Sequence, residues 1–74
     1  MPTKDHKFLP DIWLGPDGEP VTCVDKLAVL NENLEELYEM AQEALEDAVV
    51  MGCDEAQVRK VLGDLIAALE EPFA

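Results

Sequence analysis

Apolar residues recur in alternating steps of four and three from residue 23 to residue 51, and no other feature constrains the fold as strongly. The members of this stripe are Cys23, Leu27, Leu30, Leu34, Leu37, Ala41, Ala44, Ala48 and Met51. Such steps place every member on one side of an α-helix. Gly52 follows the last member directly, as is typical of a helix C-terminus. The pattern therefore predicts one helix over residues 23–51, about 43 Å long.

A second, shorter helix is predicted over residues 55–71. Asp54 suits the N-cap position, and Gln57 three residues later completes a capping box. Pro72 then ends a second apolar stripe, which consists of Val58, Val61, Leu62, Leu65, Ala68 and Leu69. The short connection at residues 52–54 forces the two helices to fold back on each other. The expected fold class is therefore all-α, an antiparallel helical hairpin over residues 22–74.

Residues 1–21 are predicted to form an irregular arm before the hairpin. They hold four of the five prolines and two of the four glycines of the chain. The segment Gly15-Pro16-Asp17-Gly18 predicts a turn at residues 15–18, since proline and glycine occupy the turn positions that suit them. Pro20 limits any strand pairing beside this turn, so we expect little regular strand.

The unequal lengths of the two helices predict a further cover for the longer one. The helix at 55–71 is too short to reach Leu27 and Leu30, which the arm or a second chain must then bury. Two helices alone give a thin core, so we expect a homodimer that forms a four-helix bundle with closed twofold symmetry. The core or dimer seam is expected to comprise Leu27, Leu30, Leu34, Leu37, Ala41, Ala44, Ala48, Val58, Val61 and Leu65.

Charge narrows the range of partners. The 74 residues carry 17 acidic and five basic residues, a formal net charge of -12, which disfavours nucleic acid and anionic membranes. Five glutamates form a stripe at helical spacing, and Lys26 is the one basic residue of the long helix. This glutamate stripe is interpreted as a docking surface for a basic partner or, alternatively, as a solvated face. It consists of Glu32, Glu36, Glu39, Glu43 and Glu46.

Trp13, with Ile12 and Leu14 beside it, gives a second candidate binding surface. Tryptophan is enriched among the residues that dominate binding energy. The competing interpretation is that this apolar cluster only completes the fold by covering the start of the long helix. The sequence leaves both interpretations open.

Side chains for catalysis or metal binding are scarce. Serine is absent, the single histidine (His6) has no partner at metal-ligand spacing, and no glycine-rich phosphate loop is present. We therefore expect no enzyme activity, catalytic residue, cofactor or metal site. Cys23 and Cys53 are too few for a disulfide scaffold, and in one chain a long helix separates them.

The sequence predicts a non-enzymatic acidic module that binds another protein through the glutamate stripe or the Trp13 arm, as an adaptor, accessory subunit or inhibitor. A basic or apolar surface on the partner is expected. The alternative is a thiol redox or metal-binding module that uses Cys23 and Cys53 across a dimer. No apolar run approaches signal-peptide or membrane-spanning length, so a cytoplasmic location without membrane contact is expected.

Overall fold

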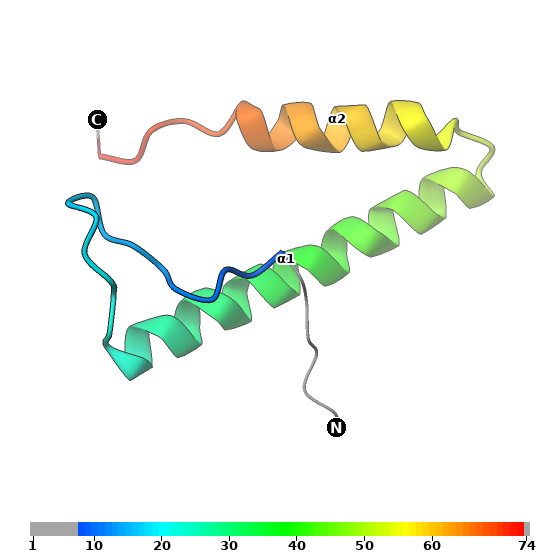
Figure 1. Cartoon of the computed structure of the whole chain (residues 1–74). Coiled ribbons are helices and arrows are strands. Elements are labelled where there is room, and N and C mark those ends of the chain that lie inside the picture. Colours follow the sequence, from blue (N-terminus) through cyan, green and yellow to red (C-terminus); the bar gives the residue numbers. More distant parts are fainter. Residues whose placement is uncertain (1–7, 74) are drawn as a thin grey trace, which may run out of the picture. The chain divides into compact units, whose positions relative to one another are not determined.

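The computed structural model describes residues 8–73 and contains two helices in contact (Figure 1). Helix α1 spans Val24–Val50 (27 residues), and helix α2 spans Glu55–Ala67 (13 residues). No strand occurs within residues 8–73, so the all-α class and the helical hairpin are confirmed. His6 lies outside the described residues.

The chain divides into two compact units, and the boundary falls inside α1. The first unit, Met1–Leu37, contains the arm and the first half of α1. The second unit, Tyr38–Ala74, contains the second half of α1 and all of α2. The contact between the helices therefore belongs to the second unit.

Helix α1 ends one residue before the predicted boundary, in hydrogen bonds that glycine makes possible. The Gly52 N–H donates to the Val49 carbonyl at 3.0 Å, and the Cys53 N–H donates to the Ala48 carbonyl at 2.9 Å. Gly52 has a φ of 96°, a left-handed conformation that glycine adopts without steric cost. This geometry satisfies carbonyls at the end of α1 and turns the chain toward α2.

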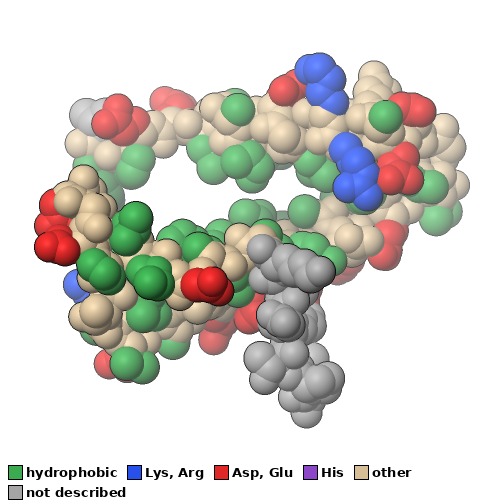
Figure 2. Space-filling model, in the orientation of Figure 1, with side chains coloured by type: hydrophobic (Ala, Val, Ile, Leu, Met, Phe, Trp, Pro, Cys, Tyr) green, Lys and Arg blue, Asp and Glu red, His purple; other side chains and the backbone are tan. Residues whose placement is uncertain are grey.

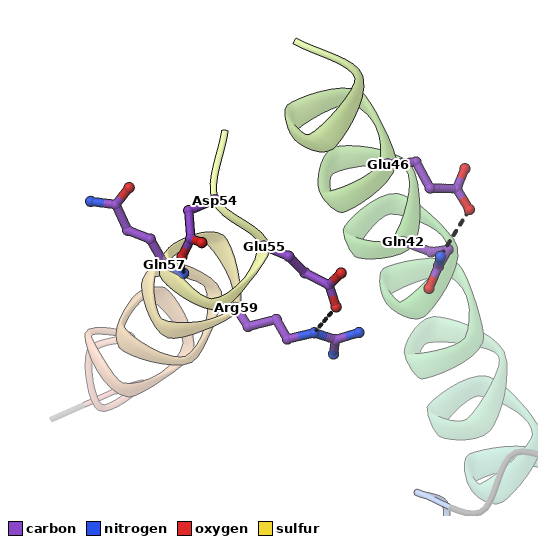
Figure 3. Close-up of polar contacts among 6 residues, drawn as sticks. All are labelled: Gln42, Glu46, Asp54, Glu55, Gln57 and Arg59. Carbon is purple, nitrogen blue, oxygen red and sulfur yellow. Dashed lines mark hydrogen bonds and ion pairs between the residues drawn. The ribbon is translucent and has the colours of Figure 1, made fainter. Parts of the chain in front are cut away.

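Helix α2 begins as predicted. The Asp54 carboxylate accepts a hydrogen bond from the Gln57 backbone N–H at 2.8 Å (Figure 3). Asp54 has extended backbone angles (φ -72°, ψ 125°), as an N-cap residue requires. The side chain that precedes α2 therefore satisfies one of its exposed donors.

The predicted C-terminal boundary of α2 was wrong, because the helix ends at Ala67 and not at residue 71. The Ala68 N–H still bonds back to the Asp64 carbonyl at 2.9 Å, but the helix does not continue. Glu70 and Glu71 would have formed its last turn, where negative charge opposes the helix dipole. Pro72 also disfavours a helical conformation at the residue before it.

The core of the second unit is small. Leu45 is the one buried side chain among the described residues. In the same unit, Ala41 and Ala48 on α1 and Val58 and Leu62 on α2 are half-buried. The large apolar side chains of α2 that stay exposed are Val61, Leu65 and Ile66, with Leu69 just beyond the helix. Apolar side chains accordingly remain visible along α2 in Figure 2.

In the first unit, the arm turns at residues 15–18. The Gly18 N–H donates to the Gly15 carbonyl at 2.9 Å, and Gly18 has a φ of 85°. Leu14 and Pro20 form a single isolated antiparallel bridge. The Val21 N–H donates to the Trp13 carbonyl at 2.8 Å, which ties the two sides of the turn together.

Two alanine substitutions test the turn between the helices. An added Cβ meets no atom within 4 Å at either Gly52 or Gly63, but only Gly52 has a positive φ. We expect Gly52→Ala to lower the free energy of unfolding by about 1–2 kcal/mol. Gly63→Ala should raise it by about 1 kcal/mol, because alanine is the better helix former.

Urea unfolding followed by far-ultraviolet circular dichroism, at one fixed protein concentration, measures both changes. Gly63→Ala serves as the matched control. If the two substitutions shift stability in the same direction, the left-handed residue at position 52 is not what ends α1.

Candidate interaction surfaces

The glutamate stripe lies along α1. All five members, Glu32, Glu36, Glu39, Glu43 and Glu46, are exposed. They span about 21 Å of helix, from the helical rise. The Gln42 amide donates to the Glu46 carboxylate at 2.8 Å, one turn away (Figure 3). The stripe thus presents negative charge along the side of α1 opposite its apolar stripe.

Helix α2 carries two basic residues, and each is paired with a carboxylate on the same helix. Arg59 pairs with Glu55 at 2.9 Å, and Lys60 pairs with Asp64 at 2.8 Å, each one turn apart. Figure 2 shows blue cationic side chains beside red carboxylates on this part of the molecule. These pairs neutralise charge on α2, whereas α1 has Lys26 alone against eight acidic residues: Asp25, Glu32, Glu35, Glu36, Glu39, Glu43, Glu46 and Asp47.

The Trp13 side chain, in the arm, contacts α1 of the same chain. Its indole Nε1–H donates to the Asn31 Oδ1 at 2.9 Å, across eighteen residues of sequence, and the contact is part-buried. Trp13, Val21, Leu27 and Asn31 help to line a depression of about 430 Å³. The arm of one chain therefore covers part of the α1 stripe within the first unit.

Sequence reasoning missed Asn31 as the partner of Trp13. Asn31 is half-buried beside Leu27 and Leu30, and a polar residue next to an apolar stripe was the available signal. Buried indole N–H groups usually find an acceptor. Ile12 and Leu14, the other members of the Trp13 candidate surface, remain exposed.

Burial differs along the predicted seam. On α1, Leu27, Leu30, Leu34, Ala41 and Ala48 are half-buried, whereas Leu37 and Ala44 are exposed. On α2, Val58 is half-buried, and Val61 and Leu65 are exposed. The seam is thus only partly covered in a single chain.

Cys23 and Cys53 are both free and exposed, and they belong to different units. No group of three or more His, Cys, Asp or Glu side chains within residues 8–73 could hold a metal ion. Neither helix in that range is long and apolar enough to cross a bilayer.

Comparisons with protein-family models, curated proteins and solved structures find no match to this chain.

The Trp13–Asn31 contact is tested by Asn31→Ala. Loss of the acceptor should lower the free energy of unfolding by about 1 kcal/mol and should expose Trp13 to quenchers. Trp13 is the single tryptophan, so its fluorescence reports on the arm directly. Acrylamide quenching and urea unfolding make the measurement.

Asn33→Ala is the matched control, because Asn33 lies on the same helix and is exposed. It should leave the quenching of Trp13 unchanged. Equal quenching in the wild type and in the Asn31 variant would show that this hydrogen bond does not hold the arm.

Proposed function

We propose that this protein is a non-enzymatic interaction module that binds a protein with a basic surface through its glutamate stripe. The observation that carries the proposal is the exposure of five carboxylates on one side of α1, a helix with one basic residue. Like charges in adjacent turns destabilise a helix slightly. A complementary basic surface removes that repulsion and gives the stripe a role.

The environment of Trp13 favours the glutamate stripe over the arm as the binding surface. A binding anchor must be available to insert into a partner's pocket. Trp13 instead donates its hydrogen bond to Asn31 and is half-buried. We therefore assign the arm to covering α1.

The proposal includes a homodimer, because the single chain leaves much of its seam exposed. It also includes a cytoplasmic location, where both cysteines remain reduced. Adaptor, accessory subunit and inhibitor are all compatible with a surface that binds by charge.

Binding by exposed carboxylates should be weak per contact and sensitive to salt. Exposed ion pairs contribute about 0–1 kcal/mol each, and physiological salt screens charge beyond about 8 Å. Four changes, Glu32→Gln, Glu36→Gln, Glu39→Gln and Glu43→Gln, should together weaken binding on the order of 10- to 100-fold. Capture of binding proteins from the native lysate at low and high salt, with quantitative mass spectrometry, measures the effect.

A matched variant removes four negative charges that lie outside the glutamate stripe, by Asp11→Asn, Glu19→Gln, Glu70→Gln and Glu71→Gln. It should retain the partner that the first variant loses. If both variants lose the partner equally, net charge and not the stripe controls binding. If Ile12→Ser with Leu14→Ser abolishes capture while both charge variants retain it, the arm is the binding surface.

A thiol function remains the second proposal, and the exposure of both cysteines supports it. It predicts that oxidant produces a covalent dimer on non-reducing gels and that Cys53→Ser prevents its formation. Unchanged behaviour of the Cys53 variant under oxidant would count against a thiol role.

A further inference from the structure

We propose that a second copy of this chain docks on one side of the helix pair in the second unit. We call this side the neutral face and define it by Ala44, Ala48, Met51, Val61 and Leu65. The inference specifies the homodimer included in the proposed function. Its test measures self-association alone and is separate from the capture of a basic partner.

The two sides of the helix pair differ in chemistry. Gln42 on α1 and Arg59 on α2 mark the polar side, where a depression of about 220 Å³ lies between the helices. Its other lining residues are Tyr38, Ala41, Leu45 and Leu62.

The helical period places the neutral face on the other side of the helix pair. With about 100° between successive residues, Ala44 and Ala48 point away from Gln42 on α1. In the same way, Val61 and Leu65 point away from Arg59 on α2. Val61 is 55% exposed and Leu65 is 53% exposed, although both belong to the apolar stripe of α2.

Charge selects a second copy as the occupant. A chain of net charge -12 can approach its own copy closely only over a surface that is poor in carboxylates. The neutral face has no charged member. On α2 its border is the Lys60–Asp64 pair, at 2.8 Å, and on α1 it is Asp47. A basic partner would be attracted to the glutamate stripe instead.

Side-chain size makes the neutral face self-complementary. Its α1 members Ala44 and Ala48 are small, and its α2 members Val61 and Leu65 are larger. In a twofold dimer each copy offers the same surface, so the large side chains of α2 can enter the space over the alanines of the other α1. The shape of the face thus suits a copy of itself.

The register follows from the distance of each residue to the turn. Ala44 lies six residues before Val50, the last residue of α1, and Val61 lies six residues after Glu55, the first residue of α2. A twofold axis parallel to the helices therefore places Val61 of one copy against Ala44 of the other. The same axis places Asp47 of one copy at nearly the same height along the helices as Lys60 of the other copy, and these two side chains carry opposite charges.

Val61→Glu tests the face, and Val50→Glu is its matched control. Both substitutions add one negative charge to an exposed valine of the second unit, but Val50 (85% exposed) lies on the acidic side of α1. Sedimentation equilibrium under reducing conditions should show a dimer for the wild type and for Val50→Glu. For Val61→Glu the dissociation constant should rise at least about 100-fold, because each dimer would bury two unpaired carboxylates.

If Val61→Glu fails to fold, a cross-linking measurement tests the proposed dimer independently. In chains with Cys23→Ser and Cys53→Ser, a tagged Ala44→Cys chain is mixed with an untagged Val61→Cys chain and oxidised. The proposed register predicts a disulfide between the two chains. A Val50→Cys chain used in place of the Val61→Cys chain should form little of this disulfide.

Three results would overturn the inference. One is a folded wild type that stays monomeric at high micromolar concentration. Another is a dimer that persists in Val61→Glu, or dissociates equally in both glutamate variants. The third is a wild-type dimer in which oxidant links Cys23 of one copy to Cys53 of the other. That disulfide requires the two helix–helix turns to lie at opposite ends of the dimer, whereas the proposed axis places them at the same end. None of these results depends on whether the glutamate stripe binds a basic partner.

Discussion

The contact between α1 and α2 around Leu45 is the constraint on which the structure depends. Helix α2 has 13 residues against 27 in α1, and Leu45 is the one side chain within residues 8–73 that their packing buries. The other apolar side chains of the helix pair are half-buried or exposed, so the hairpin alone buries little apolar surface. The Trp13 arm adds cover in the first unit, and in our proposal a second copy adds it in the second.

The separation of charge on α1 makes the proposed self-association compatible with the proposed binding of a basic partner. The glutamate stripe occupies the side of α1 opposite the apolar stripe, and the Lys60–Asp64 and Arg59–Glu55 pairs neutralise charge on α2. A strongly acidic chain can then associate through an uncharged surface while its carboxylates stay in solvent. If the charges were distributed evenly around α1, self-association would bring carboxylates together at short range, where their repulsion is strongest.

The proposed dimer also bears on binding strength. Single exposed ion pairs contribute little, so one glutamate stripe would bind the proposed basic partner weakly and with strong dependence on salt. Two copies present two stripes, and a partner with two basic surfaces would bind the second intramolecularly, which increases affinity without new contacts. In these proposals, self-association and binding of a basic partner use different surfaces of the chain, the neutral face and the glutamate stripe.

The sequence by itself determined the helices, because their signals are local. The four-three spacing and Gly52 predicted α1 to within one residue at each end, and Asp54 predicted the start of α2. Pro72 predicted the end of α2 at residue 71, but the helix ends at Ala67, before Glu70 and Glu71, whose negative charge opposes the helix dipole. Only the tertiary structure decided that Trp13 bonds to Asn31 and that Leu45 is buried while Val61 and Leu65 stay exposed. Those outcomes depend on which surfaces meet across long stretches of chain, and helical periodicity carries no information about that.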